Sequence, residues 1–490
     1  MSAISSVAVD TVIIGGGQAG LAMSHCLMDR GIHSQVILEK GNIGERWRSS
    51  YWDSLHLLTP NWQTRLPGKW SYQGKEMDGF MTKAEFVHLL EGYAASFEAP
   101  IQTNTNVIEV AEFITNGGEQ AGSSALRFKV TAVTNTDSRA NPSSSTRIWL
   151  ARNVVLATGY CDLPNIPNFA RNLPVSTWVR QIAATDYKNP SQVLSWFQQQ
   201  PEMAGRSIDN VILVVGAGAS GIQIAHELGK AVRQNRNGIQ PIVMISVGRH
   251  CRWPRKYRGK DILWWMDQME AFRSSAVQQD EASSPGPQLS GYPGHTDASL
   301  YHLHNELGVQ VVGKTTIRKS SGSSTIQFDN AMLADCLKQA DDGCIQVLKA
   351  IDQFIIQQRL DATNTTALTN SPFEGSCGDP CPRLESSTSS DTGFVLPDDG
   401  FPTQCEQATR MCIIWATGFT RQYPFLSESL HERLWDAERF ILENHGGITT
   451  HPGLYVLGYR WLRRKHSNFV DGVGDDAREL AQHIAASGIS

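Results

Sequence analysis

The segment Asp10–Gly31 reads DTVIIGGGQAGLAMSHCLMDRG and places Gly15, Gly17 and Gly20 between an apolar β-branched run and an apolar run of helical period. A strand, a glycine turn and a helix in this order open a βαβ unit. The glycines permit the tight turn, the close approach of a pyrophosphate and the packing of helix against strand. The segment therefore predicts a dinucleotide-binding domain.

An acidic residue supports this prediction. The next apolar run, VILEK, ends with Glu39 and Lys40, and Glu39 follows the turn at the spacing of about 20 residues that the dinucleotide fingerprint requires. At the end of the second strand, its carboxylate would accept hydrogen bonds from ribose hydroxyls. Glu39 is therefore predicted to bind the cofactor.

The same design recurs about 200 residues later. Residues 209–231 read DNVILVVGAGASGIQIAHELGKA, with Gly216, Gly218 and Gly221 in the turn and Ser220 beside them. The following strand, PIVMISVGR, ends with Arg249 and has no acid. A cation at this place suits a 2′-phosphate, so the second site is predicted to bind NADPH, with Arg249 as the phosphate ligand.

Two shorter segments also echo each other. NVVLATGYCDLPNIP and CIIWATGFTRQYPFL each place Ala-Thr-Gly after a buried apolar strand, which adds Thr158, Gly159 and Gly418 to the predicted cofactor-binding residues. Their separation suggests that one domain interrupts another. We predict an α/β protein with two Rossmann-like dinucleotide-binding domains, divided as follows: residues 1–165, FAD-binding domain, first part; 166–362, inserted NADPH-binding domain; 363–404, Ser/Pro/Gly-rich insert or loop; 405–490, C-terminal part of the FAD-binding domain.

Composition excludes several classes of protein. The 490 residues are 41% hydrophobic and 19% charged, which is typical of globular chains. Lysine and arginine number 43 against 48 acids, a net charge of −5 that gives no basic field for nucleic acid. No apolar run is long enough for a membrane span, and the first residues do not resemble a signal peptide. The nine scattered cysteines fit a reducing compartment and show no complete metal set, so we expect a cytoplasmic protein without metal.

Two dinucleotide sites in one chain imply that one dinucleotide passes electrons to the other. With NADPH at the second site, the first is most economically FAD, which would accept hydride from the nicotinamide. Neither glycine turn is followed by a CxxC pair, and no nucleophile elbow or HExxH motif is present. Oxygen or a small acceptor therefore remains as the destination of the electrons.

With these features, the chain resembles the class B flavin-dependent monooxygenases, including the YUCCA-type branch. The resemblance spans nearly the whole chain apart from 363–404, through GGGQAG, GERW, YWDSLHLLTPNWQTRLPG, ATGY, GAGASG, ATGF and GLYVLGYRWLRRKHSNFVDGVGDDA. It implies FAD on the first turn and Glu39, with Trp47 and Arg48 near the flavin or its phosphates. It also implies that the LTPNW stretch from Leu58 lines the flavin face, while Gly472 and Gly474 close the site at a helix start.

The family mechanism implied is that NADPH reduces FAD, oxygen forms a (hydro)peroxide adduct at flavin carbon 4a, and a small organic substrate is oxygenated. Heteroatom oxidation, Baeyer-Villiger insertion and oxidative decarboxylation share this chemistry, and no catalytic side chain is identified by a sequence pattern. The stretch Ala183–Tyr187 lacks the histidine of the family fingerprint, which keeps open an NADPH-dependent flavin oxidase or reductase. A nucleotide-binding sensor with little turnover also stays open, as does a homo-oligomeric state.

Overall fold

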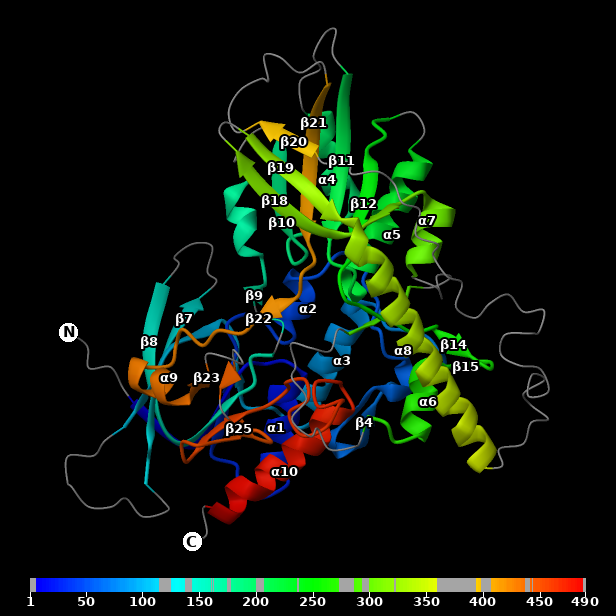
Figure 1. Cartoon of the computed structure of the whole chain (residues 1–490). Coiled ribbons are helices and arrows are strands. Elements are labelled where there is room, and N and C mark those ends of the chain that lie inside the picture. Colours follow the sequence, from blue (N-terminus) through cyan, green and yellow to red (C-terminus); the bar gives the residue numbers. More distant parts are fainter. Residues whose placement is uncertain are drawn as a thin grey trace.

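The computed structural model describes residues 6–113, 125–136, 143–159, 161, 163–173, 178–199, 207–235, 238–272, 286–292, 299–320, 323–358, 394–397, 407–436, 441–442 and 444–487. They form two α/β bodies, one below the other in Figure 1. The predicted α/β class with two dinucleotide-binding folds is confirmed. The predicted insert 363–404 lies outside the described residues except for the strand Phe394–Pro397.

The first body is built on a sheet whose central strands run parallel in the order β27-β8-β1-β2-β5. A hairpin of β6 and β7 is attached to β8, and β26 and β25 extend the opposite edge. The strands are β1 (Ser6–Ile14), β2 (Gln35–Leu38), β5 (Ile101–Gln102), β6 (Thr105–Glu112), β7 (Phe128–Thr136), β8 (Ser143–Leu156), β25 (Asn444–His445), β26 (Ile448–Thr449) and β27 (Leu454–Val456).

Three helices cover one face of this sheet: α1 (Gln18–Met28), α3 (Lys83–Ser96) and α10 (Gly472–Ser487). Helices α1 and α10 pack side by side although they lie at opposite ends of the chain (Figure 1). The other face packs against the β6–β7 hairpin and α9 (Glu428–Leu434). Alternate residues of β1 serve the two cores, Ile13 on the helical side and Val12 on the other, as the strand period of two requires.

The second body has an entirely parallel five-stranded sheet in the order β10-β21-β11-β12-β17. Its helices pack on one face, while β18 and β19 pack on the other. Its main elements are β10 (Val179–Ala183), α4 (Pro190–Gln198), β11 (Ser207–Val215), α5 (Ala219–Gln234), β12 (Ile242–Ser246), α7 (Leu300–Leu307), β17 (Gln310–Val312), β18 (Lys314–Ser320), β19 (Ser323–Asp329), β20 (Phe394–Pro397) and β21 (Gln407–Trp415).

A third group of elements flanks both bodies. The long helix α8 (Asn330–Gln357), yellow in Figure 1, packs on α6 (Ile262–Gln268). The shorter elements are α2 (Glu45–Ser49), β3 (Arg65–Leu66), β4 (Trp70–Ser71), β9 (Leu163–Pro164), β13 (Cys251–Arg252), β14 (Lys256–Tyr257), β15 (Lys260–Asp261), β16 (Pro287–Gln288), β22 (Phe419–Thr420), β23 (Trp435–Asp436) and β24 (Ile441–Leu442), with 3-10 turns at Asn61–Gln63, Pro67–Lys69 and Asn168–Asn172.

One predicted boundary needs correction. We placed residues 405–490 in the FAD-binding domain, but β21 lies inside the second sheet, parallel to β10 and β11. The chain returns to the first body only after Trp415, through β22, which pairs with β9 on the outgoing crossing. The two crossings therefore lie together between the bodies (Figure 1).

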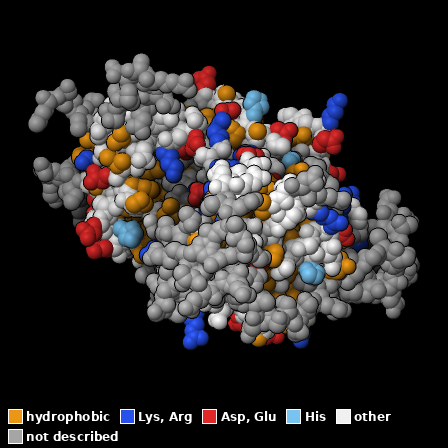
Figure 2. Space-filling view, turned by 90° about the horizontal axis from the view of Figure 1, so that it is seen from above, with side chains coloured by type: hydrophobic (Ala, Val, Ile, Leu, Met, Phe, Trp, Pro, Cys, Tyr) orange, Lys and Arg blue, Asp and Glu red, His pale blue; other side chains and the backbone are white. Residues whose placement is uncertain are grey.

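Surface charge is mixed. Seen from above in Figure 2, acidic and basic side chains of the described residues are interspersed with apolar and neutral ones. The described part of this face therefore presents no field of a single sign.

Within the same described residues, none of the helices combines the length and the apolar character that crossing a bilayer requires.

Candidate functional site: two glycine turns and a polar wall between them

The first glycine turn lies between β1 and α1, where the sequence predicted it. Gly15 has φ +112°, and a Cβ there would lie 2.5 Å from the Ala157 carbonyl oxygen. A Cβ on Gly20 would lie 1.9 Å from the Gly15 carbonyl oxygen, so these two glycines are needed by the protein itself. A Cβ on Gly17 would meet nothing within 4 Å. The space over Gly17 is therefore open to a ligand.

The start of α1 suits an anion. Gly17 is the N-cap, no side chain caps the helix, and its first turn holds no acidic residue. The first N–H groups of a helix lack intrahelical partners and carry the positive end of the helix dipole. The turn thus fits the pyrophosphate of a dinucleotide by both its open space and its charge.

Glu39 lies where the ribose is expected. The residue is 8% exposed, one carboxylate oxygen accepts the Gly16 N–H at 2.6 Å, and the other accepts the Gly41 N–H at 2.9 Å. These bonds fix the carboxylate beside the turn, and each oxygen keeps a further lone pair for a hydroxyl donor. The structure therefore places Glu39 as predicted, and its binding to ribose stays a prediction.

The second turn repeats the first. Gly216 has φ +107° and is held against the Ala416 carbonyl, while a Cβ on Gly221 would lie 1.8 Å from the Gly216 carbonyl oxygen. Gly218 is the N-cap of α5, again without a side-chain cap, and a Cβ on it would meet nothing within 4 Å. Ser220 lies in the first turn of α5. The second turn therefore also fits a pyrophosphate.

The two sites differ after the second strand. Gly15 N–H donates to the Leu38 carbonyl at 2.9 Å, and Gly216 N–H donates to the Ser246 carbonyl at 3.0 Å. The structural counterpart of Glu39 is therefore Val247, which is 1% exposed. Arg249 follows two residues later and is exposed. The second site therefore has no acid where a ribose 2′-hydroxyl would be bound. The strand ends at Ser246 and not at Arg249 as predicted, and the contact of Arg249 with a 2′-phosphate stays a prediction.

Each Ala-Thr-Gly segment lies beside one turn. Ala157, followed by Thr158 and Gly159, touches the first turn through its carbonyl, and Ala416 does the same at the second. Gly159 and Gly418 have positive φ, 82° and 87°, with open space at their Cβ positions. Gly418 therefore lies at the second turn and not at the first.

The GERWR segment contains two predicted cofactor-binding residues, Trp47 and Arg48, and the structure places them in different surroundings. Trp47 is half-buried and packs against the helix-side core of the first body and that of the second. Its ring lies edge-on to Phe86 at a centroid distance of 4.9 Å. Arg48 pairs with Glu91 of α3 and donates to the Ile43 carbonyl. Arg48 thus has protein partners at the surface, and its predicted contact with flavin or phosphate stays a prediction.

Four residues with buried polar atoms form a set that we call the polar wall. Of these residues, the sequence predicted only the one in the LTPNW stretch. The wall consists of Asn61, Gln63, Thr64 and Asp471. The side-chain atoms Asn61 Oδ1, Gln63 Oε1, Thr64 Oγ1 and Asp471 Oδ1 are buried and have no hydrogen-bond partner among the described residues. Unpaired buried polar groups are costly, so this set indicates that a polar ligand completes it. The LTPNW stretch predicted to line the flavin face contains the first of these residues.

The helix α10 begins at Gly472, as predicted, next to this wall. A Cβ on Gly472 would lie 2.0 Å from the His466 carbonyl oxygen, and Gly474 lies against Pro67. Gly472 is therefore required by close packing, whether or not it contacts a cofactor, while a Cβ on Gly474 would need only a small shift of Pro67.

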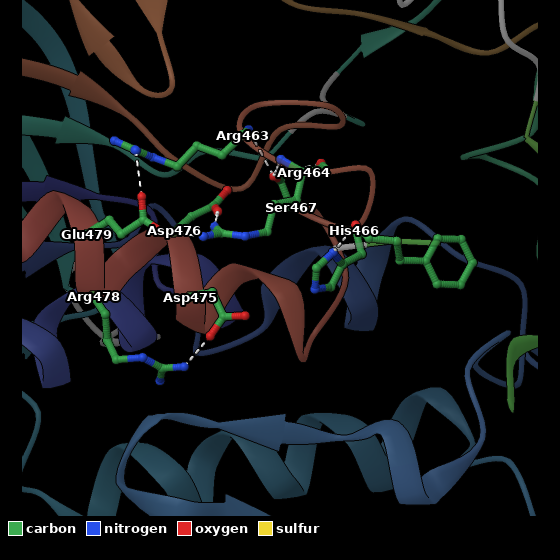
Figure 3. A network of polar contacts seen from close by, with 9 residues as sticks. Arg463, Arg464, His466, Ser467, Asp475, Asp476, Arg478 and Glu479 are labelled. Atoms are coloured by element: carbon green, nitrogen blue, oxygen red, sulfur yellow. Dashed lines mark hydrogen bonds and ion pairs between the residues drawn. The ribbon is translucent and has the colours of Figure 1, made fainter. Parts of the chain in front are cut away.

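An ion-pair network holds the loop before α10 in place (Figure 3). Arg464 donates to the fully buried Asp476 at 2.7 Å and also pairs with Glu479. The Ser467 hydroxyl accepts both backbone N–H groups of Arg463 and Arg464, at 3.1 Å and 2.9 Å. Burial raises the pKa of Asp476, opposed by Ser467 and Arg464. The network thus fixes the segment that leads into Asp471.

The loop from Leu58 also contacts the segment between β13 and β14. Arg255, 1% exposed, donates to the Leu58 carbonyl at 2.8 Å, pairs with Asp261 at 2.7 Å, and its guanidinium lies 4.2 Å from the centre of the Phe80 ring. Tyr187, in the stretch without the fingerprint histidine, donates to Glu227 at 2.9 Å. The Arg255 bond thus ties the segment between β13 and β14 to the loop before Asn61, whereas the Tyr187–Glu227 bond lies within the second body.

None of the described cysteines forms a disulfide, and three of them are poorly suited to thiol chemistry. Burial raises the pKa of Cys26 and Cys412 to about 12 and that of Cys251 to about 11. A reactive cysteine needs a lowered pKa, since the thiolate is the nucleophile. These three thiols therefore do not support a dithiol mechanism.

Known proteins share this architecture. Residues 12–120 match the family described as pyridine nucleotide-disulphide oxidoreductase. The chain is 29% identical to an uncharacterized CzcO-like oxidoreductase of Geobacillus kaustophilus, over 97% of this chain and 98% of that protein. It is 30% identical to the indole-3-pyruvate monooxygenase YUCCA6 of Arabidopsis thaliana, over 52% of this chain and 51% of that protein. The flavin-containing monooxygenase from Stenotrophomonas maltophilia has the same fold, with a TM-score of 0.56, 18% identity, and coverage of 98% of this chain and 99% of that one.

Two glycine turns without a side-chain cap, with a buried acid beside the first and a cation near the second, fit a protein that binds two dinucleotides. These comparisons show that the chain is similar to class B flavin-dependent monooxygenases in sequence and in fold. The resemblance indicated by the motifs is thereby confirmed.

Proposed function

We propose that this enzyme is an NADPH- and O2-dependent monooxygenase that oxygenates a small organic molecule. The observation that carries the proposal is the chemical difference between two otherwise matching turns. The first has a buried acid, Glu39, for a ribose, and the second has Val247 at that place with Arg249 beside it. The first is therefore assigned to FAD and the second to NADPH.

The residues of the chain would act mainly by binding and orientation. The N–H groups at the starts of α1 and α5 would hold the two pyrophosphates, and Gly17 and Gly218 leave room for them. Bound FAD supplies hydride acceptance from NADPH and activation of oxygen at ring carbon 4a. The Arg255 contact with Leu58 holds the segment between β13 and β14 against the loop that would line the flavin face, where exclusion of water protects such chemistry.

An anaerobic stopped-flow experiment tests the proposal. The FAD-loaded protein is reduced with NADPH and then mixed with oxygenated buffer while the flavin absorbance is followed. We expect rapid reduction by NADPH, followed by a long-lived species whose spectrum differs from those of reduced and oxidised flavin. Addition of an accepted substrate should hasten its decay.

Other outcomes would contradict the proposal. Direct return to oxidised flavin, with one peroxide released for each NADPH consumed in the presence of every substrate tried, would indicate an oxidase or reductase. Bound FAD that NADPH does not reduce would indicate a binding protein with little turnover.

A further inference from the structure

The polar wall contains a carboxyl group that the two turns and their cofactor assignment do not explain. The Asp471 side chain is 10% exposed, and its Oδ2 accepts a hydrogen bond from the Gln63 amide at 3.4 Å. Its Oδ1 has no partner among the described residues. Asn61, Gln63 and Thr64 beside it are 3%, 2% and 1% exposed. A carboxyl group this buried with an unused oxygen indicates a ligand that binds it.

The position of the wall relative to the first turn identifies which part of a ligand reaches it. Glu39 and Gly16 mark the adenosine side of the turn. On the other side, Gln18 at the start of α1 donates to the Asn468 carbonyl at 3.1 Å, in the loop that leads to Asp471. In FAD the isoalloxazine follows the pyrophosphate on the side opposite the adenosine. The flavin ring is therefore the part of FAD that extends toward the wall.

The charged groups around Asp471 come from three elements. Arg65 of β3 lies 3.7 Å from Asp471 and equally 3.7 Å from Asp267 of α6, so two carboxylates share one guanidinium that is 47% exposed. His466, 4% exposed, has its Nδ1 2.6 Å from the Phe272 carbonyl oxygen and faces Asp471 from the preceding loop. Figure 3 shows the His466 ring beside the start of α10.

Burial raises the pKa of the Asp471 carboxyl above its usual value. Interaction with His466, with Arg65 and with the Gln63 amide acts in the opposite direction, and Asp267 adds to the rise. An ionised carboxylate with one oxygen unpaired in a dry site is strongly disfavoured, whereas a carboxylic acid can donate from that oxygen.

We propose that Asp471 contacts the isoalloxazine ring of FAD as a neutral carboxylic acid, donating a hydrogen bond from Oδ1 while Gln63 holds Oδ2. The assignment rests on the proposed function, because it takes FAD as the ligand of the first turn. The flavin ring offers carbonyl and ring-nitrogen acceptors for this donor. Its N3–H group is a donor for the Asn61 or Gln63 oxygen.

This contact has a consequence for the reduced flavin. The reduced ring carries negative charge at neutral pH, which a neutral donor stabilises and an ionised carboxylate opposes. Asp471 in its acid form therefore raises the reduction potential of bound FAD. Ionisation of Asp471 at higher pH lowers that potential.

The test compares Asp471→Asn, Asp471→Ala and a control, Asp475→Asn. Asp475 lies in the same first turn of α10 but pairs outward with Arg478. Two quantities are measured in each variant: the dissociation constant of FAD, and the midpoint potential of bound FAD across pH in an anaerobic dye titration. Thermal unfolding of each apoprotein confirms that the variant is folded.

We expect Asp471→Ala to bind FAD about fivefold to tenfold more weakly, the effect of losing one hydrogen bond, with a lowered potential. Asp471→Asn keeps a neutral donor, so its midpoint potential should match that of the wild type at low pH. At high pH it should lack the additional fall in midpoint potential that ionisation of Asp471 causes in the wild type. Asp475→Asn should match the wild type throughout.

Two results would overturn the assignment alone: FAD bound with unchanged affinity and potential in Asp471→Ala, or Asp471→Asn behaving like Asp471→Ala at every pH. A wild-type protein that binds no FAD would overturn the proposed function as well.

Discussion

A pair of alanine substitutions in the first turn separates what the fold needs from what the cofactor needs. Gly17 and Gly20 are three residues apart, and both belong to the dinucleotide fingerprint. A Cβ on Gly17 would meet no protein atom within 4 Å, and its φ of −88° and ψ of −170° are open to alanine. A Cβ on Gly20 would lie 1.9 Å from the Gly15 carbonyl oxygen. Gly17→Ala should therefore impair binding alone, and Gly20→Ala should impair folding and binding.

The magnitudes follow from these contacts. In Gly17→Ala the loss of a favourable N-cap residue and the smaller entropy of the unfolded chain oppose each other, so the unfolding free energy should change by less than about 1 kcal/mol. In Gly20→Ala the contact with Gly15 must open from 1.9 Å to at least 3.4 Å, an overpacking that costs about 1–3 kcal/mol or more. For a domain of this size each kcal/mol lowers Tm by roughly 2–4 °C.

Binding should respond in both variants. A methyl group on Gly17 blocks the approach of the pyrophosphate to the helix N–H groups, and losing one charge-assisted hydrogen bond costs about 1.5–3 kcal/mol, or about tenfold to a hundredfold in FAD affinity. The assay is FAD titration of each apoprotein by flavin fluorescence, together with its thermal unfolding. Gly17→Ala with wild-type affinity, or with a fall in apoprotein Tm equal to that of Gly20→Ala, would refute the reasoning.

Three further predictions concern other sites. Arg249→Ala should weaken NADPH binding much more than NADH binding in parallel titrations, whereas equal weakening would indicate another phosphate ligand. Asp476→Ala removes the buried partner of Arg464, which keeps Glu479, and should lower the unfolding free energy by about 1–3 kcal/mol in denaturant titrations; an unchanged unfolding free energy would contradict this. Glu112 has a pKa lowered from 4.5 by hydrogen bonds from His451 and Arg433, so its stabilisation is present above pH 4.5 and lost as the pH falls through its folded value. Unfolding of Glu112→Gln should therefore depend less on pH in this acid range than unfolding of the wild type, and parallel pH curves would refute it.

The sequence predicted the parts of the fold whose signals are local. The two glycine turns, the strands before them and the start of α10 depend on nearby residues, and all lie where expected. The sheet joined by β21 was mispredicted because a fully buried parallel strand is apolar on both faces. Its sequence therefore carries no mark of which sheet it enters. The Ala-Thr-Gly echo is a repeat between the two bodies rather than a return to the first.

The candidate site was predictable where one segment supplies the chemistry and not where distant segments meet. Glu39 follows its turn at a fixed spacing, whereas the hydrogen bond from Gln63 to Asp471 joins residues about 400 positions apart. The pairing of Arg48 with Glu91 on α3 likewise depends on how two helices pack. The partners of Arg48 and of Asp471 are therefore set by tertiary packing and not by the motifs in which these residues lie.

The two turns show how one backbone design serves two different dinucleotides. Both use a glycine at positive φ against a neighbouring carbonyl and a helix start without a side-chain cap, so both offer the same pyrophosphate site. Selectivity must then come from the first residue after the second strand, because that residue reaches the ribose. There the chain has Glu39 at one site and Val247, with Arg249 beyond it, at the other. A carboxylate bonded to the turn would repel a 2′-phosphate, while a valine leaves that space to the arginine, and under the proposed function this difference would direct NADPH to the second site and FAD to the first.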